Sequence, residues 1–337
     1  MPPDPPDARL SGTDSGAGAG TGRPVIAHQL PEQFERSLPD APEGFEWRRL
    51  ARECAWEVPP EARALILAPP RGGAERTPAR PPAGWPRGLR WIHSLAVGME
   101  EYPSWVFEAP LVTCSRGANS VSVAEFVIAA LLAFEKQLPQ IWIACAQDWR
   151  PREGLGTLEA KTLGLVGYGG IGQATATRAL AFGMRVLAAR RSARTGVTSE
   201  GVRIEPLERV LDEADHLVIA VPLTPATAGL IDAAALARLK HGAHLVNVAR
   251  GRVIDQPALL AALDAGRLAF ATLDVCDPEP PPAGHRLYDH PRVHLSPHLS
   301  GTAGATRAKA AALLSANLRR FLAGEPLQGV VRKELGY

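Results

Sequence analysis

Residues 162–192, TLGLVGYGGIGQATATRALAFGMRVLAARRS, contain the pattern that decides the fold. TLGLV is a short apolar run that predicts a buried strand, and QATATRALAF has the composition of a helix. Gly183 suits the left-handed position that ends a helix, and MRVLAA predicts a second strand. Between the first strand and the helix, GYGGIG fits the GxGxxG motif. The motif alone is weak evidence in a chain with 32 glycines. As the turn of a strand–helix–strand unit of about 30 residues, it predicts a dinucleotide-binding fold.

The glycines of this motif have separate physical roles. Gly167 lets the chain turn sharply, Gly169 lets the backbone approach a pyrophosphate, and Gly172 lets the helix pack close to the strand. The pyrophosphate then lies on unpaired N–H groups at the positive end of the helix dipole. A glycine-rich turn that binds no ligand is the alternative. We expect the following residues to contact a dinucleotide: Gly167, Gly169, Gly170, Ile171 and Gly172.

The end of the second strand departs from the usual pattern. An acidic residue is expected there to bind the ribose 2′-hydroxyl, but this chain has Arg190, Arg191 and Ser192. A carboxylate would repel a 2′-phosphate, whereas two guanidinium groups and a hydroxyl would bind one. The sequence therefore predicts a preference for NADP(H), with NAD(H) as a possible second cofactor. The alternative is that both arginines are solvated surface charges.

Composition limits the class of protein. The chain has 337 residues, enough for about two domains, with 46% hydrophobic residues, 21% charged residues and a net charge of +2. This balance predicts neither a nucleic-acid partner nor a membrane surface. The beginning, MPPDPPDARLSG, lacks the apolar core of a signal peptide, and the longest apolar run, residues 126–134, is too short to span a membrane. Four cysteines without a CxxC pair suggest buried, reduced thiols in a cytoplasmic protein.

The remaining pattern extends the predicted fold in both directions. Residues 1–23 are rich in Pro, Gly and Ser and are expected to form a disordered tail. The helix predicted from Ser122 is apolar nearly all round, which indicates burial between layers, domains or subunits, with Glu125, Glu135 and Lys136 at its polar ends. Strand and helix patterns alternate after residue 193 and predict a parallel, doubly wound sheet. A helix over residues 302–322 is expected to pack back onto the first domain.

Charged side chains follow three of the late strands, where ligands gather in such folds. Arg250, Glu279 and His298 would together suit the reduction of a 2-oxo acid. Arg250 would bind the carboxylate and polarise the carbonyl, His298 would donate a proton as hydride arrives, and Glu279 would hold the imidazole. Each alone has a simpler interpretation as a solvated charge. His285, His290 and His294 add a run of histidines, but Pro291 and Pro297 break any helix that would align them, so no metal site is expected.

At these residues the chain resembles the D-isomer-specific 2-hydroxyacid dehydrogenases. The resemblance covers residues 24–337 and is carried by VGYGGIG, VPLTPATAGLI, LVNVARGRVID, ATLDVCDPEPPP and LSPHLSG. It implies an α/β protein with two doubly wound parallel-sheet domains. A Rossmann NAD(P)-binding domain, residues 119–299, would be inserted in a flavodoxin-like substrate domain, residues 24–118 and 300–337.

The resemblance also implies roles for single residues. The family's catalytic Arg, Glu and His correspond to Arg250, Glu279 and His298, and the spacing of 29 positions from Arg250 to Glu279 is the one expected of the family. Asp274 would lie beside the nicotinamide carboxamide and Thr227 near the phosphates. Further cofactor contacts would come from Val221, Pro222, Ala249, Arg250 and His298. Val97 and Gly98 would hold the substrate carboxylate by their backbone N–H groups, with Arg250 and His298 completing the substrate contacts.

Three functions remain open from the sequence. The first is an NADPH-dependent reductase of a small 2-oxo acid, glyoxylate or hydroxypyruvate, that acts as a homodimer through the Ser122 helix and the arm IWIACAQDW. The second is a phosphoglycerate or other D-2-hydroxyacid dehydrogenase, against which the absence of a regulatory domain after the last helix would weigh. The third is a corepressor-like scaffold that binds a dinucleotide as a sensor. Ala96 and Cys276 stand where the family commonly has Gly and Phe, which leaves the shape of the substrate pocket open.

Overall fold

The computed structural model describes residues 23–30, 32, 38, 42–51, 56–68, 78–100, 102–149, 154–191, 195–302 and 304–332. The chain divides into two compact units. The first combines Met1–Ala118 with Gly304–Tyr337, and the second is Asn119–Ala303. Apart from Arg23, the predicted tail lies outside the described residues, and so does Ser192.

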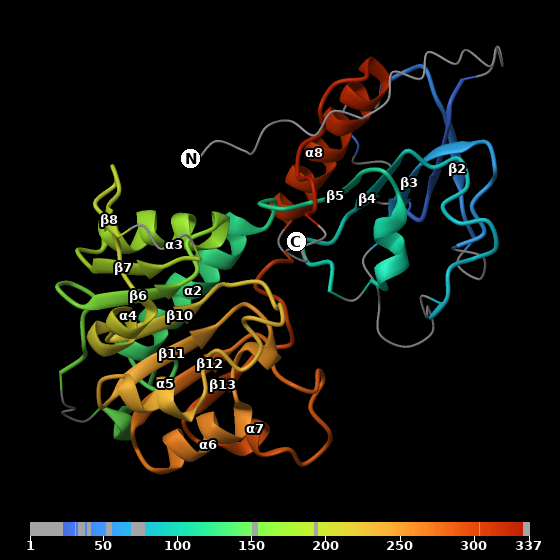
Figure 1. The fold of residues 1–337 in the computed structure, drawn as a ribbon. Coiled ribbons are helices and arrows are strands. Elements are labelled where there is room, and N and C mark those ends of the chain that lie inside the picture. Colours follow the sequence, from blue (N-terminus) through green and yellow to red (C-terminus); the bar gives the residue numbers. More distant parts are fainter. Residues whose placement is uncertain are drawn as a thin grey trace. The chain divides into compact units, whose positions relative to one another are not determined.

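The first unit contains a five-stranded parallel sheet with the order β2-β1-β3-β4-β5 (Figure 1). Its strands are β1 (Val25–His28), β2 (Glu46–Arg49), β3 (Ala62–Leu67), β4 (Trp91–Ser94) and β5 (Val112–Cys114). Most of them are short apolar runs buried on both faces, as expected for a covered parallel sheet. The order is that of flavodoxin-like folds, which confirms the predicted fold class.

Alternate residues of β3 contact two separate cores in this unit. Ala64 and Ile66 pack in one cluster with the helix α8 (Gly304–Ala323), whereas Leu65 and Leu67 pack in the other with the 3₁₀ helix η2 (Ser104–Glu108). The expected return of the last helix to the first unit is therefore confirmed.

The second unit contains an eight-stranded sheet with the order β13-β12-β11-β10-β6-β7-β9-β8. The bounds are β6 (Thr162–Val166), β7 (Arg185–Ala189), β8 (Gly196–Val197), β9 (Arg203–Ile204), β10 (His216–Ile219), β11 (Ala243–Asn247), β12 (Leu268–Leu273) and β13 (Val293–Leu295). All neighbouring pairs are parallel except β8 and β9, which form an antiparallel hairpin at one edge. The doubly wound parallel sheet is thus confirmed, with an edge hairpin that the sequence pattern did not reveal.

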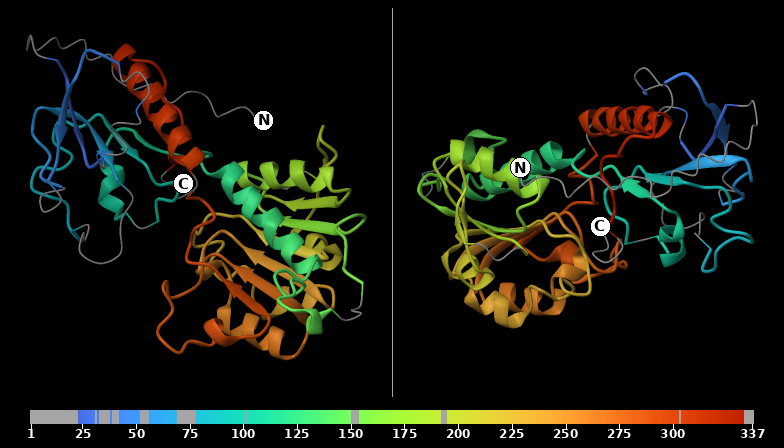
Figure 2. Two further views of the ribbon diagram at one scale, coloured as in Figure 1. Left: turned by 180° about the vertical axis from the view of Figure 1, so that it is seen from behind. Right: turned by 45° about the horizontal axis from the view of Figure 1, so that its top comes forward.

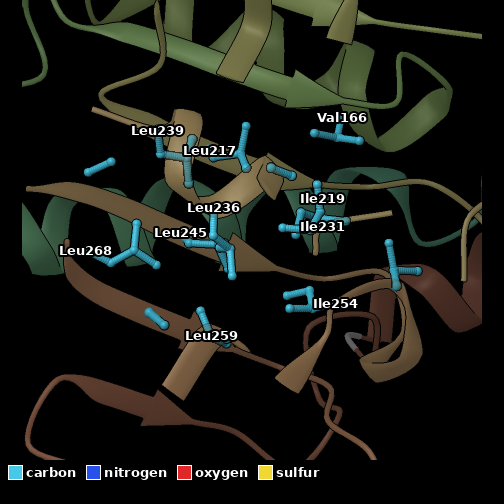
Figure 3. Packing of buried hydrophobic residues seen from close by; sticks show 14 of the residues in the cluster. Val166, Leu217, Ile219, Ile231, Leu236, Leu239, Leu245, Ile254, Leu259 and Leu268 are labelled. Atoms are coloured by element: carbon cyan, nitrogen blue, oxygen red, sulfur yellow. The ribbon is translucent and has the colours of Figure 1, made fainter. Parts of the chain in front are cut away.

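Helices cover both faces of this sheet (Figure 2). The helices are α2 (Ser120–Glu135), α3 (Gly170–Ala181), α4 (Leu207–Glu213), α5 (Ala233–Arg238), α6 (Gln256–Asp264) and α7 (Arg286–Asp289), with 3₁₀ turns η3 (Ala146–Asp148) and η4 (Gly251–Val253). α2 and α3 share one apolar cluster, and α4, α5 and α6 share the other. Figure 3 shows the second cluster, in which Leu217, Ile219 and Leu245 of the strands meet Leu236 and Leu259 of the helices.

Local signals in the sequence explain where several helices begin and end. Asp232 and Asp255 accept hydrogen bonds from the N–H groups of Ala235 and Ala258 and so cap α5 and α6. α3 ends at Ala181, and Gly183 follows with a φ of +73°. α2 begins at Ser120 rather than at Ser122. None of the helices that the structure describes is long and apolar enough to cross a membrane.

Glu135 is the last residue of α2, as expected, but it does not lie at a solvated end of the helix. Its side chain is buried, and its carboxylate contacts the ammonium group of Lys161 and lies 2.9 Å from His216 Nε2. Burial opposes ionisation of Glu135, but His216 and Lys161 together hold its pKa below the usual value. His216 Nδ1 lies 3.3 Å from His244 Nδ1, and the ring of Phe134 stacks on His244. The Glu135 carboxylate is therefore a buried charged group, paired with Lys161 and His216.

Each unit contains a fully buried histidine that makes stability depend on pH. Burial lowers the pKa of His93 in β4 to about 3, and burial with the nearby charges of His216 and His294 lowers the pKa of His244 in β11. The unfolded chain binds protons at both histidines as the pH falls below about 6.5, while the folded units keep them neutral. Stability should therefore fall with falling pH, by about 1.4 kcal/mol per pH unit for each histidine.

Urea unfolding at about pH 7.5 and about pH 5.5 measures this dependence. His93→Asn removes the titrating group from the first unit and should flatten the pH dependence of that unit's transition alone. Stability that is equal at both pH values in the wild type would contradict the prediction.

Candidate dinucleotide and catalytic site

The GxGxxG motif forms the turn between β6 and α3. Gly167 has a φ of +107°, in the region that favours glycine, and a Cβ there would come 2.5 Å from the carbonyl oxygen of Ala220. A Cβ on Gly172 would overlap the carbonyl oxygen of Gly167. Both glycines are therefore required by close backbone contacts, as their predicted roles imply. Around Gly169 a Cβ would meet no atom within 4 Å, so this part of the turn is open.

The amino end of α3 suits the phosphates of a dinucleotide. No side chain caps this helix at Gly169, so the N–H groups of its first turn, which include Gly170 and Ile171, have no capping acceptor. An anionic pyrophosphate would supply acceptors and would also meet the positive end of the helix dipole. The turn lies where β6 meets β7 on one side and β10 on the other, which is where the strand order reverses and such folds bind their ligands.

Arg190 and Arg191 directly follow β7, and both are exposed. Tyr168 of the GxGxxG turn is a neighbour of this strand end. Burial raises the pKa of Tyr168, a hydrogen bond with Thr198 opposes this shift, and the charges of Glu200 and Arg190 act on the same hydroxyl. Thr198 and Glu200 could not be predicted from the sequence as neighbours of this site, because they belong to the short β8–β9 hairpin. The predicted phosphate-binding end of β7 therefore has two arginines and one acidic neighbour.

Val221, Pro222 and Thr227 form the loop after β10. A Cβ on Gly167 would lie 2.9 Å from Val221 Cγ1, so Val221 borders the GxGxxG turn. Thr227 Oγ1 donates to the carbonyl oxygen of Pro222 at 2.6 Å and accepts from the N–H of Thr224 at 2.8 Å. The Thr227 hydroxyl therefore stabilises the conformation of the loop that contains it.

Arg250 follows β11, and its turn is fixed by the side chain of Asn247. The Asn247 amide donates to the carbonyl oxygen of Arg250 at 3.1 Å and accepts from the N–H of Ala249 at 3.0 Å. Arg250 is half-buried, and its Nη1 donates to the carbonyl oxygen of Ala249 at 2.7 Å. A Cβ on Gly251 would overlap the backbone of Cys276, so the loops after β11 and β12 lie directly against each other.

Glu279 and His298 are brought together from the loops after β12 and β13. Glu279 Oε1 lies 2.6 Å from His298 Nδ1, a short distance for a hydrogen bond to a carboxylate. The two side chains remain accessible, at 39% and 44% exposure. With Nδ1 paired to the carboxylate, His298 Nε2 is the nitrogen left to act on a ligand. The structure therefore joins the predicted carboxylate and imidazole, with Arg250 at the end of the adjacent strand β11.

The buried carboxylate of Asp274 holds the loop that contains His298. Its Oδ1 accepts from Ser296 Oγ at 2.7 Å and from the N–H of Leu299 at 2.8 Å, and its Oδ2 accepts from the N–H of Ser300 at 3.0 Å. The N–H of His298 donates to the carbonyl oxygen of Asp274 at 2.9 Å. His298 has a φ of +53°, a conformation that costs a non-glycine residue about 1–3 kcal/mol. Asp274 thus has a structural role that the sequence did not predict.

Val97 and Gly98 lie in the first unit, in the bend that follows β4. Both are half-buried, and their backbone N–H groups donate to none of the residues that the structure describes. The role predicted for Val97 and Gly98, binding a substrate carboxylate, requires N–H groups that are available to donate.

The described cysteines only partly match the expectation of buried thiols. Cys114 and Cys276 are buried, but Cys145 is exposed. Burial, with the charges of Glu279 and Asp277, raises the pKa of Cys276 to about 11, so this thiol stays protonated and is a poor nucleophile. Within the described part of the chain, no three histidine, cysteine or acidic side chains are arranged to hold a metal ion.

Comparison with known proteins agrees with this geometry. Residues 128–300 match the family model for the NAD binding domain of D-isomer specific 2-hydroxyacid dehydrogenases. Glyoxylate reductase of Pyrococcus furiosus is 41% identical over 92% of this chain and 95% of its own length. D-3-phosphoglycerate dehydrogenase of Bacillus subtilis is 36% identical over 66% of this chain, but the match spans only 42% of that enzyme.

Solved structures of the family have the same fold. A D-isomer specific 2-hydroxyacid dehydrogenase of Xanthobacter autotrophicus, in complex with NADPH and MES, aligns with a TM-score of 0.78 and 29% identity over 94% of this chain and 100% of that one. An NADPH-dependent glyoxylate/hydroxypyruvate reductase of Sinorhizobium meliloti, in complex with NADP and malonate, aligns with a TM-score of 0.71 and 27% identity over 93% and 98%. The chain therefore belongs to the D-isomer specific 2-hydroxyacid dehydrogenases, a family of NAD(P)-dependent oxidoreductases that act on the CH–OH group.

Proposed function

We propose that this protein uses NADPH to reduce a small 2-oxo acid, glyoxylate or hydroxypyruvate, to the D-2-hydroxy acid. The observation that supports this most is the Glu279–His298 pair at 2.6 Å, because an imidazole fixed at Nδ1 by a carboxylate is a suitable proton donor at Nε2. The Pyrococcus relative is a glyoxylate reductase, and the Sinorhizobium neighbour is an NADPH-dependent glyoxylate/hydroxypyruvate reductase.

The proposed reaction divides the chemistry between cofactor and protein. Bound NADPH supplies the hydride that reaches the carbonyl carbon. Arg250 binds the substrate carboxylate and polarises the carbonyl, because its guanidinium offers several donors in a fixed plane. His298 Nε2 gives its proton to the carbonyl oxygen, and Glu279 holds the imidazole and favours its charged form. The products are the hydroxy acid and the oxidised cofactor, and His298 regains its proton from water.

Further contacts with cofactor and substrate belong to the proposal. Gly167, Gly169, Gly170, Ile171 and Gly172 would hold the pyrophosphate, and Val97 and Gly98 would hold the substrate carboxylate through their N–H groups. Cofactor contacts are further proposed for Val221, Pro222, Thr227, Ala249 and Asp274.

A phosphoglycerate dehydrogenase is the second candidate, favoured by the match to the Bacillus enzyme. Steady-state assays of wild-type protein with glyoxylate, hydroxypyruvate and, in the oxidative direction, 3-phosphoglycerate separate the two candidates. The proposal requires the higher kcat/KM with one of the first two substrates. A dinucleotide-sensing scaffold would bind cofactor and turn over none of the three.

We also propose that the protein forms a homodimer in the cytoplasm. Four large apolar residues on the segment after α2 support the dimer, because monomers rarely expose apolar side chains in such a group. They are Trp142, Ile143, Trp149 and Leu155, with Trp142 and Trp149 exposed by 72% and 82%. Sedimentation equilibrium tests the assembly, and a monomer at micromolar concentration contradicts it.

His298→Ala removes the proposed proton donor. We expect kcat for glyoxylate reduction to fall about 10²- to 10⁴-fold, the usual loss for a general acid, with the Kd for NADPH little changed. His241→Ala is the matched control, since His241 is an exposed histidine in a turn of the same unit. Stopped-flow measurement of NADPH oxidation gives the rates. A variant that retains near-normal turnover would show that another group supplies the proton.

Arg190→Asp tests the cofactor preference. A 2′-phosphate has nearly two negative charges, and one or two charge-assisted hydrogen bonds from Arg190 and Arg191 correspond to about 10- to 100-fold in affinity. Wild-type protein should therefore bind NADPH at least about tenfold more tightly than NADH. Arg190→Asp should reverse this order, because a carboxylate repels the phosphate and accepts from a ribose hydroxyl.

Fluorescence titration with both reduced cofactors measures the four dissociation constants. Arg238→Asp makes the same change of net charge at an exposed arginine of α5, which pairs with Asp212, and should leave the preference unchanged. Equal affinity of the wild type for NADH and NADPH would show that Arg190 and Arg191 do not bind the 2′-phosphate.

A further inference from the structure

The bend after β4 is held by a small buried hydrogen-bond network. Ser94 Oγ accepts from the N–H of Ala96 at 3.1 Å and lies 3.1 Å from the Tyr102 hydroxyl. The Tyr102 hydroxyl donates to the carbonyl oxygen of Ala68 at 2.8 Å. Since a phenol has one proton, Tyr102 accepts from Ser94, and each hydroxyl in this network then has a defined direction.

Two further contacts fix the ends of the bend. The N–H of Ser115 is shared between the carbonyl oxygens of Ser94 and Ala96, at 3.1 and 3.2 Å. The side chains of Met99 and Tyr102 are buried in the apolar cluster of the first unit. The bend is therefore anchored at Ser94, Ala96 and Met99, and Val97 and Gly98 lie between the anchors.

A second row of polar groups lies behind Ser94. Trp91 Nε1 donates to Thr113 Oγ1 at 2.9 Å, and Thr113 Oγ1 lies 2.7 Å from His93 Nδ1. His93 Nε2 lies 3.5 Å from Ser115 Oγ, which in turn donates to the carbonyl oxygen of Ser94 at 3.4 Å. Trp91 can only donate, so Thr113 accepts from it and donates to His93 Nδ1. His93 Nε2 then donates to Ser115, and every group in the row has a partner. Buried polar groups that are fully paired make a segment rigid.

We propose that Tyr102 is a positioning residue for the substrate: through Ser94 its hydroxyl holds the Ala96 amide, and so aims the N–H groups of Val97 and Gly98 at the carboxylate of a 2-oxo acid. This inference rests on the proposed function. Two adjacent N–H groups that are fixed before binding lose less freedom when they meet an anion than donors in a mobile loop. The hydroxyl thus contributes to affinity without touching the substrate.

Tyr102→Phe removes this single oxygen and keeps the ring in the apolar cluster. The carboxylate is bound alike in the ground state and the transition state, so the loss should appear in KM rather than in kcat. We expect the KM for glyoxylate to rise about three- to tenfold with kcat changed less than about twofold. The Kd for NADPH should be unchanged.

Ser94→Ala breaks the same connection at its other end. The effects of Ser94→Ala and Tyr102→Phe on KM should therefore not add, and the double variant should resemble the stronger single variant. Ser315→Ala is the control, since Ser315 Oγ is a buried hydroxyl in α8 of the same unit that pairs with no described residue. It should keep the wild-type KM. A general loss of structure would instead lower the thermal midpoint and change kcat together with KM.

Binding of oxamate, an unreactive analogue of a 2-oxo acid, to the NADPH complex separates this inference from the proposed function. Wild-type turnover combined with an unchanged KM and oxamate affinity in Tyr102→Phe would overturn the positioning role alone. Protein that reduces no 2-oxo acid would overturn the proposed function, whereas weaker oxamate binding by Tyr102→Phe would still support the positioning role. Absence of oxamate binding by the wild type would overturn both.

Discussion

The buried carboxylate of Asp274 organises the candidate catalytic site. Its two oxygens accept from Ser296, Leu299 and Ser300, and its own carbonyl accepts from the N–H of His298. A buried carboxylate is costly unless its acceptor sites are filled, and here the loop after β13 fills them. The loop therefore has one favourable arrangement, in which His298 adopts its left-handed conformation and meets Glu279. The carboxylate thus stabilises the strained conformation of the residue that we propose as the proton donor.

Sheet topology explains why these groups meet at all. Strands β6, β10, β11, β12 and β13 are parallel neighbours, so the loops that follow them emerge along one edge of the sheet. The backbones of neighbouring loops are also in direct contact at two glycines, where no side chain separates them. Gly167 lies against Ala220, and Gly251 lies against Cys276. The dinucleotide turn, Arg250 and the Glu279–His298 pair are in this way placed along a single edge by short connections.

Much of this arrangement is predictable from local sequence. The GxGxxG unit and the helix caps Asp232 and Asp255 depend on neighbouring residues, so pattern alone identifies them. The burial of Glu135 could not be predicted, because its partners, Lys161 and His216, lie far along the chain and leave no periodic signal. The role of Asp274 was missed for the same reason, since its main donors are backbone N–H groups 25 and 26 residues away. The β8–β9 hairpin is too short for a strand pattern to appear.

A crystal structure of the wild-type protein with NADPH and oxamate tests the central claim most directly, because it shows which groups meet the substrate. We predict that the oxamate carbonyl oxygen lies about 2.7–3.2 Å from His298 Nε2, with Glu279 still paired to Nδ1. We also predict that the oxamate carboxylate meets Arg250. Oxamate bound with its carbonyl oxygen away from His298, or with the Glu279–His298 pair broken, would contradict the account.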